Sequence, residues 1–290
     1  MVEHAPQTWK LTLAYDGTDY FGWQMQPGRA TIQNELAAAI ARVTQEAVLP
    51  QGSGRTDAGV HALAQVASFA LAAPIPAENF KRALNQTLPA AIRVLSAEVA
   101  SPGFHARHSA LRKTYEYRVF TGELCPPFLT RYVAAAKWPL DLGKMRAAAS
   151  HVIGEHDFTS FAATEPDLAQ RENEEQAPPQ RVRTIFHSDW QRADECLIYS
   201  VTGSGFLHHM VRNLVGTFVD VGRGRTSAEE MPRILATRNR RAAGPTAPAS
   251  GLFLRSVEYP SDGCPILRTG SSSVEPALSL RRGGAENSGQ

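Results

Sequence analysis

Two kinds of hydrophobic periodicity alternate along the chain, and their order restricts the fold more than any other feature. Residues 9–17 place apolar side chains at every second position, which predicts a half-buried strand ending at an Asp-Gly turn. Residues 31–45 instead space their apolar side chains along one helical face, and Thr31 is the predicted N-cap. The first half is therefore predicted to contain strand 9–17, helix 31–45, strand 60–71, helix 77–88 and strand 92–100.

A related order of elements recurs in the second half. The predicted elements are strand 113–120, helix 142–154, a hairpin of 182–191 with 196–203, helix 206–222, a short helix after a capping box from Ser227 to Glu230, and strand 251–259. The repeated order predicts an α+β fold of two similar subdomains, each with a mixed or antiparallel sheet flanked by helices.

The predicted boundaries follow from changes in composition. Residues 1–107 form the predicted N-terminal subdomain and residues 108–260 the C-terminal one. Residues 163–181 are acidic and then Pro-rich, which predicts a long mobile loop. Residues 261–290 are rich in Gly and Ser, which predicts a disordered tail.

Composition excludes several classes of protein. A chain of 290 residues can bury a sizeable core without disulfides or structural metals. The cysteines Cys125, Cys196 and Cys264 are widely spaced and far from any histidine cluster, which argues against a disulfide framework and a zinc site. The N-terminus lacks the apolar core of a signal peptide, and no run approaches the roughly 18 apolar residues of a membrane span. We therefore expect a soluble, cytoplasmic protein.

The distribution of charge is more informative than its total. A net charge of +2 neither requires nor excludes a nucleic-acid partner. Basic residues cluster at 104–113, 222–225 and 238–241, whereas acidic residues gather at 171–176. Each of these runs, taken alone, is more often solvated surface than a binding site.

The segment GRTDAGVHA at 54–62 presents a single carboxylate, Asp57, on a glycine-rich loop that leads into a predicted strand. Such a loop can direct a side chain into a cleft. The competing interpretation is an Asx-turn, in which Asp57 bonds to its own backbone.

The predicted helix 206–222 has an apolar stripe with His208 and Arg212, four residues apart, at its edge. An arginine in this position either extends to solvent or pairs with a buried acid and favours the ionised form of that acid. The neighbouring pair His208–His209 suggests a metal site. We reject that site, because adjacent helical positions diverge by about 100 degrees and no third ligand is evident.

The predicted strand 113–120 places Lys113, Tyr115 and Tyr117 on one face. Tyrosines in strands usually serve sheet packing. An aromatic side chain beside a basic segment can also stack an unpaired RNA base.

Together, five stretches resemble the tRNA pseudouridine synthase A family over roughly residues 8–260. They are YDGTDYFGWQ (15–24), GRTDAGVHA (54–62), FHARHSALRKTYEYR (104–118), FLHHMVRNLVGTFVDVGRGR (206–225) and AAGPTAPASGLFLRSVEY (242–259). The acidic loop at 163–181 and the tail lengthen this chain beyond the family's pattern.

The resemblance implies an isomerase that converts uridine to pseudouridine at positions 38–40 of the tRNA anticodon stem-loop. It implies the pseudouridine synthase fold, with two halves like RRM or ferredoxin domains around a central cleft, no cofactor or metal, no membrane association, and a homodimer whose two subunits build the tRNA cleft. Asp57 matches the catalytic aspartate, Arg55 the arginine beside it, Tyr115 the tyrosine that packs against the target base, and Arg212 the basic residue that pairs with the aspartate. Further expected substrate contacts are Arg107, Lys113, His208, Arg223 and Arg225.

A single carboxylate is sufficient for this reaction, because no water is added and no redox step occurs. Asp57 either attacks C1′ or removes the C2′ proton, and the sequence leaves both roles open. One alternative is a non-catalytic tRNA-binding or chaperone protein that uses the same cleft. A glycoside hydrolase is a more distant alternative, because it would need a second acid at a suitable distance.

Overall fold

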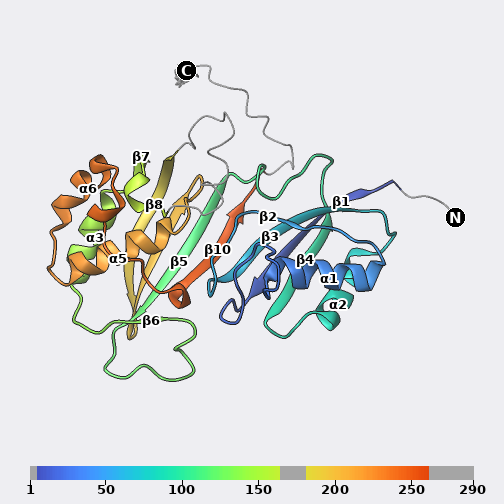
Figure 1. Cartoon of the computed structure of the whole chain (residues 1–290), viewed down its shortest axis with the longest axis horizontal. Helices are drawn as coiled ribbons and strands as arrows, with labels where there is room; N and C mark the ends of the chain where they lie inside the picture. Colours follow the sequence, from blue (N-terminus) through green and yellow to red (C-terminus); the bar gives the residue numbers. More distant parts are fainter. Residues whose placement is uncertain (1–4, 164–180, 261–290) are drawn as a thin grey trace, which may run out of the picture.

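The computed structural model describes residues 5–163 and 181–260. Its strands form one ten-stranded sheet, whose main path runs β4-β1-β3-β10-β5-β9-β8-β7 (Figure 1). The α+β class predicted from the sequence is confirmed, and the sheets of the two halves join into a continuous one. The predicted tail at 261–290 and nearly all of the predicted loop at 163–181 lie outside the described residues.

The N-terminal half follows the predicted order closely. Its elements are β1 (Gln7–Tyr15), α1 (Ile32–Thr44), β2 (Gln51–Gly52), β3 (His61–Leu71), α2 (Ala77–Thr87) and β4 (Ile92–Val99). The side chain of Thr31 accepts a hydrogen bond from the backbone N–H of Asn34, so the predicted N-cap is confirmed. Strand β1 buries every second side chain and pairs antiparallel with both β3 and β4.

The C-terminal half contains β5 (Arg112–Phe120), β6 (Ala134–Ala135), α3 (Leu142–Ser150), β7 (Gly154–Asp157), β8 (Val182–Ala193), β9 (Cys196–Gly203), α5 (Met210–Gly222), α6 (Met231–Thr237) and β10 (Leu252–Glu258). Strands β8 and β9 form the predicted antiparallel hairpin. In β5, Tyr115 and Tyr117 are buried on one face, while Glu116 on the other face pairs with Arg118 and Arg255 at 2.7 and 3.0 Å. The predicted division of β5 into two faces is therefore confirmed.

Strand β10 joins the two halves, although it is the last strand of the described residues. It pairs parallel with β3, where Phe253 lies opposite His61. On its other side it pairs antiparallel with β5, where Leu252 lies opposite Tyr117. Because β3 follows the Asp57 loop and β5 carries Tyr115, this strand sets the spacing between residues from both halves.

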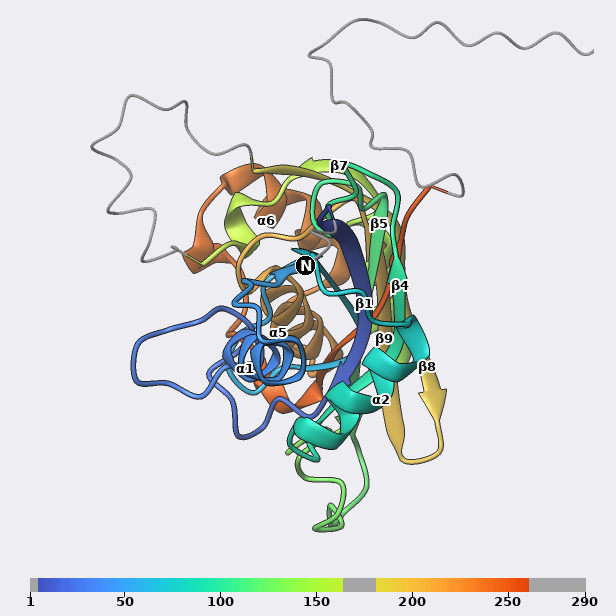
Figure 2. The same cartoon turned by 90° about the vertical axis from the view of Figure 1, so that its right-hand side faces the viewer.

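The helices that frame the site lie on the same side of the sheet. Figure 2 shows the sheet nearly edge-on, with α1, α5 and α6 to its left. Phe218 anchors α5 to the sheet by edge-on contacts with Tyr199 and Trp190, whose ring centroids lie 5.3 and 6.4 Å away. These three side chains are fully buried, and such aromatic pairs contribute about 0.5–1.5 kcal/mol beyond the burial of their area. The position of α5 over the sheet is thus fixed by packing.

Three local predictions were wrong. Helix α5 begins at Met210 rather than at residue 206, because His209 adopts a left-handed backbone conformation with φ of 59°. Helix α3 ends at Ser150 rather than at 154, and Gly154, with φ of 107°, begins β7 instead. The capping box at Ser227 does not form, because this side chain makes no capping hydrogen bond and the chain enters a 3₁₀ turn. None of the helices within the described residues is long and apolar enough to cross a membrane.

Candidate active site

The Asp57 loop is held from behind by buried polar side chains. Thr56, next to Asp57, hydrogen-bonds the hydroxyl of Tyr15 at 2.9 Å, and the amide of Gln65 donates to the Gly54 carbonyl at 2.9 Å. The backbone at Gly22, with φ of 81°, packs directly against this loop. A Cβ on Gly22 would lie 2.4 Å from the Thr56 carbonyl oxygen, so only glycine allows this contact. Burial raises the pKa of Tyr15 to about 12, so its hydroxyl keeps its proton for this bond. The loop is therefore a fixed platform for Asp57.

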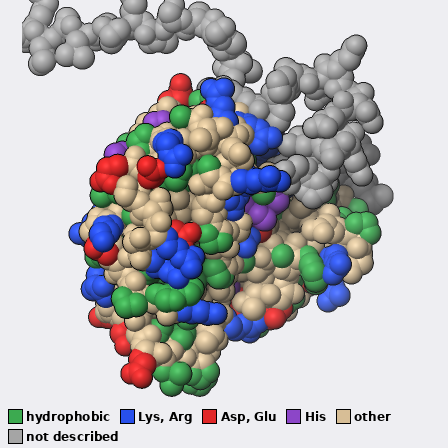
Figure 3. Space-filling view, turned by 60° about the vertical axis from the view of Figure 1, so that its left-hand side comes forward, with side chains coloured by type: hydrophobic (Ala, Val, Ile, Leu, Met, Phe, Trp, Pro, Cys, Tyr) green, Lys and Arg blue, Asp and Glu red, His purple; other side chains and the backbone are tan. Residues whose placement is uncertain are grey.

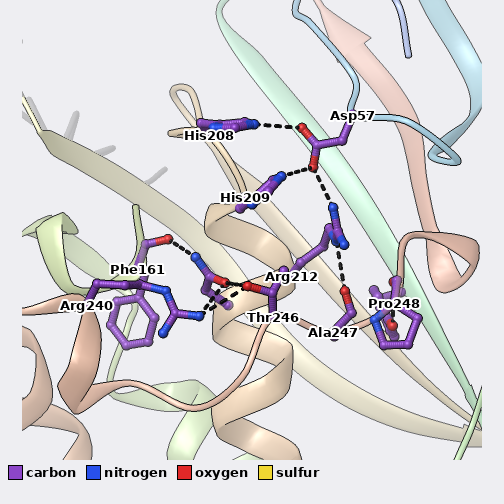
Figure 4. Close-up of polar contacts among 11 residues, drawn as sticks. Asp57, Phe161, His208, His209, Arg212, Arg240, Thr246, Ala247 and Pro248 are labelled. Carbon is purple, nitrogen blue, oxygen red and sulfur yellow. Dashed lines mark hydrogen bonds and ion pairs between the residues drawn. The ribbon is translucent and has the colours of Figure 1, made fainter. Parts of the chain in front are cut away.

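Asp57 points away from its own loop and toward α5. Its Oδ2 accepts a hydrogen bond from Nη1 of Arg212 at 3.0 Å, across 155 residues of sequence (Figure 4). The Nε–H of Arg212 donates to the Ala247 carbonyl at 2.8 Å, so the guanidinium is fixed from two directions. The Arg212 and Asp57 side chains are 15% and 20% exposed, so solvent screens this pair less than a surface ion pair. The Asx-turn considered from sequence is not formed within the described part of the chain.

Two histidines complete the surroundings of Asp57. Nε2 of His208 lies 3.5 Å from Oδ1, and Nε2 of His209 lies 3.3 Å from Oδ2. Their rings contact each other, with centroids 3.9 Å apart. Burial lowers the pKa of His209, and the neighbouring charges of His208, Arg212 and Arg240 lower it further, while Asp57 opposes the shift. His209 is therefore neutral at pH 7 and can donate or accept a hydrogen bond without adding charge.

Both reasons for rejecting a metal site from sequence fail. His208 and His209 precede α5, so helical geometry does not separate their rings, and Asp57 is the missing third group. One potential ligand atom from each residue lies within 4.8 Å of the others. The guanidinium of Arg212 contacts the same Oδ2 that His209 approaches, and its positive charge opposes the entry of a cation. The arrangement favours an ion pair between Arg212 and Asp57 over a bound cation.

Tyr115 lies in β5 on the face that carries the site. It is 8% exposed and packs against Phe206 in an edge-on contact, with ring centroids 5.0 Å apart. Burial raises the pKa of Tyr115, and the charges of Tyr15 and Asp57 add to that shift. Its hydroxyl therefore stays protonated at neutral pH, which suits a hydrogen-bond donor or a packing surface and disfavours a base.

Three further predicted site residues, Arg55, Lys113 and Arg107, lie at different places around the Asp57 loop and β5. Arg55 is exposed on the same loop as Asp57. Nζ of Lys113 donates to the Ser53 carbonyl at 2.5 Å, which joins β5 to the base of the catalytic loop. Arg107 is exposed in the turn before β5, and its backbone N–H donates to Nδ1 of His105.

Arg223 and Arg225 lie at the opposite end of α5 from the site. Eleven residues of helical rise separate Arg212 from Arg223, about 17 Å. Both arginines approach Asp220, and the Arg223 guanidinium stacks over Trp138 at 3.3 Å. The structure therefore does not bring these two residues together with Asp57.

Sequence reasoning missed two groups of residues that shape the site. His209 was dismissed because the helix was expected to begin at residue 206, although the glycines in the preceding GSG segment favour a later start. Tyr15 and Gln65 were interpreted only as strand residues, because period-2 patterning does not show which buried polar groups meet across a sheet. The glutamine within a mostly apolar strand was the available signal.

Comparisons with known proteins identify relatives over most of the chain. Curated proteins called tRNA pseudouridine synthase A are 49% identical in Solibacter usitatus, 45% in Moorella thermoacetica and 42% in Bacillus subtilis. Each of these alignments covers 86% of this chain and 98% of the relative.

A family model described as tRNA pseudouridine synthase matches residues 12–109 and 148–260. The two matched segments contain Asp57, Arg212 and both histidines, and they include most of the strands that position them. This chain belongs to the tRNA pseudouridine synthase family.

Proposed function

We propose that this protein isomerises uridine to pseudouridine in tRNA, at positions 38–40 of the anticodon stem-loop, with Asp57 as the catalytic group. The observation that carries this proposal is the single carboxylate, fixed on a braced loop and paired at 3.0 Å with Arg212. The names of the relatives support tRNA as the substrate.

One carboxylate accounts for the whole bond exchange. In one route an oxygen of Asp57 attacks C1′ and the C1′–N1 bond breaks, leaving the electron pair on the uracil. The uracil turns, C5 bonds to C1′ and displaces Asp57, C5 loses its proton, and N1 gains one. In the other route Asp57 removes the C2′ proton, and the C1′–N1 bond breaks to form a glycal. The uracil turns, C5 bonds to C1′ while Asp57 returns the proton to C2′, C5 then loses its proton, and N1 gains one. Both routes begin from the ionised carboxylate that Arg212 favours.

The uridine must leave the RNA stack before its ribose can reach Asp57, which costs a few kcal/mol. Tyr115 can offset part of that cost, since stacking between a base and an aromatic side chain contributes about 1–3 kcal/mol. Its raised pKa disfavours Tyr115 as the acceptor of the C5 proton. Neutral His209, 3.3 Å from the carboxylate, is better suited to accept a proton.

Basic side chains around the site would hold the RNA backbone. In Figure 3 several Lys and Arg side chains and a histidine border the hollow on the visible face. Arg55, Arg107 and Lys113 lie on or beside the elements that carry Asp57 and Tyr115, whereas Arg223 and Arg225 would contact a more distant part of the tRNA. Such contacts make binding strongly dependent on salt. We further propose that the protein acts in the cytoplasm as a homodimer.

Release of tritium from tRNA labelled at C5 of uridine tests the proposed function. The wild-type protein should release tritium from positions 38–40. Asp57→Asn should still bind tRNA but should release no tritium. Asp194→Asn is a matched control, because Asp194 is exposed at the β8–β9 turn and has the positive φ that asparagine also tolerates. Absence of release at every position by the wild-type protein would refute the proposal and favour a tRNA-binding chaperone.

A further inference from the structure

A second polar cluster lies beneath α5, next to the carboxylate site. At its centre is Asn213, which is fully buried. Its amide donates to the Phe161 carbonyl at 2.7 Å, and its Oδ1 accepts from Arg240 at 2.9 Å and from Thr246 at 2.7 Å (Figure 4). Because a buried amide is costly to leave unsatisfied, these three bonds fix the positions of all three partners.

Arg240 is bound entirely by neutral acceptors. It donates to the carbonyls of Ala243 and Gly244 at 3.3 and 2.8 Å and to the Thr246 hydroxyl at 3.2 Å, in addition to Asn213. Among the described residues it enters no ion pair. Burial lowers the pKa of Arg240, and its charge also contributes to the lowered pKa of His209. These hydrogen bonds hold the chain segment 243–247 around the guanidinium of Arg240.

The segment 243–247 contacts α5 backbone to backbone. A Cβ on Gly216 would lie 1.7 Å from the Pro245 carbonyl oxygen, and one on Gly244 would lie 2.8 Å from the Cα of Thr217. The Gly244 N–H donates to the Thr217 hydroxyl at 2.9 Å. Glycine at both positions therefore allows an approach that any side chain would prevent.

The last residue of the segment is the one that contacts Arg212. The Ala247 carbonyl accepts from Nε of Arg212 at 2.8 Å, and the Ala247 N–H donates to the Arg212 carbonyl at 3.1 Å. Pro248, the next residue, is fixed by the Tyr117 hydroxyl at 2.8 Å. Hydrogen bonds among Arg240, Asn213 and Thr246, the peptide bond from Thr246 to Ala247, and the hydrogen bond from Arg212 to the Ala247 carbonyl thus connect this cluster to the guanidinium that faces Asp57.

We propose that Thr246 and Arg240 are positioning residues for the isomerisation: with Asn213 they hold the Ala247 carbonyl where it directs the Arg212 guanidinium at Asp57. This role rests on the proposed function. It also explains why the exposed Thr246 makes two side-chain hydrogen bonds inward rather than to solvent.

Thr246→Val tests the role with little risk to folding, because Thr246 is exposed and valine keeps its shape. We expect kcat to fall about 3- to 10-fold with KM for tRNA unchanged, since valine loses both hydrogen bonds of the Thr246 hydroxyl, one to Asn213 and one from Arg240, that support Arg212. The acid limb of the pH–rate profile should move to higher pH, because a less well directed guanidinium favours the ionised carboxylate less. Thr246→Ser keeps the hydroxyl and should restore both values.

Arg240→Gln should act in the same direction as Thr246→Val, and Arg240→Lys should restore part of the loss. Thr87→Val is a matched control, because its hydroxyl bonds Ala83 within α2, far from the site in the fold. Wild-type kcat and an unmoved pH–rate profile in Thr246→Val would overturn the role. A fall in activity that matches a fall in melting temperature would also overturn it.

A measurement that does not require activity separates this role from the proposed function. The ¹⁵N–¹H signal of the Arg212 Nε–H, assigned by its loss in Arg212→Lys, reports its bond to Ala247. In Thr246→Val this proton should exchange with solvent several-fold faster than in wild type or Thr246→Ser. Unchanged exchange would refute the positioning role, whereas absence of tritium release by the wild-type protein would refute only the proposed function.

Discussion

Replacing Arg212 with glutamine removes the permanent positive charge from Asp57 while keeping a polar side chain of similar reach. The charge lies 3.0 Å from Oδ2, and neither side chain is more than 20% exposed. Burial, the main cause of the lowered pKa of His209, remains in Arg212→Gln, so His209 is a poor replacement for the lost charge at pH 7. The ionised state of Asp57 in Arg212→Gln therefore loses its main support.

The size of this loss can be bounded from the contact. A hydrogen bond to a charged group contributes about 1.5–3 kcal/mol. One pH unit corresponds to about 1.4 kcal/mol, so the acid limb of the pH–rate profile should move up by about one to two units. The upper bound is Coulomb's law at 3.0 Å with an effective dielectric constant of about 20, which gives about 5–6 kcal/mol.

The assay is tritium release from tRNA, measured as kcat between pH 5 and 9. Arg212→Gln should be most impaired at low pH and partly recover at high pH. Arg212→Lys keeps the charge but loses the bond to the Ala247 carbonyl, so its acid limb should stay near that of the wild type while kcat falls. If Arg212→Gln has the wild-type pH–rate profile, Arg212 does not maintain the charge of Asp57 and the reasoning is wrong.

Three further substitutions have expected outcomes that follow from single contacts. Gly216→Ala should lower the free energy of unfolding by about 1–3 kcal/mol, measured by urea denaturation, because its Cβ would lie 1.7 Å from a backbone oxygen. Tyr115→Ala should weaken tRNA binding by about 1–3 kcal/mol in a filter-binding assay, whereas Tyr115→Phe should bind normally. Burial lowers the pKa of His61 below its unfolded value, so the unfolded chain binds more protons below about pH 6.5 and the wild-type melting temperature should fall between pH 7 and 5. His61→Asn keeps an acceptor for the Gly17 N–H and should show a smaller fall over that range; an equal fall would assign the pH dependence to other groups.

The sequence predicted the long elements of this fold because their periodicity is strong. Strand β1 alternates over nine residues and α1 carries a capping threonine, so both appear close to the predicted limits. Strands β2 and β6 have two residues each, which is too short for any period to show. The order of strands in the sheet depends on long-range pairing, and no local pattern reports that β10 lies between β3 and β5.

The candidate site was predictable only in part. Asp57 and Arg212 lie 155 residues apart, and each had an ordinary structural explanation when considered alone. Their pairing was expected from the family resemblance, and the structure shows it directly. His209 lies near Asp57 because its own backbone is left-handed and delays the start of α5. The proposed role of Thr246 depends on hydrogen bonds between segments far apart in sequence. Backbone details of this kind are set by tertiary packing rather than by local propensity.

The central position of the last strand has a consequence for biosynthesis. A nascent chain can pair β1, β3 and β4, and later β5, β8 and β9, long before residues 252–258 leave the ribosome. Until then β3 and β5 have no strand between them, so the Asp57 loop and α5 belong to two separately formed pieces. We therefore expect the carboxylate and its arginine to meet only after translation has supplied β10. Chains that terminate before β10 should accumulate as two uncoupled halves with exposed strand edges, which are targets for proteolysis and aggregation.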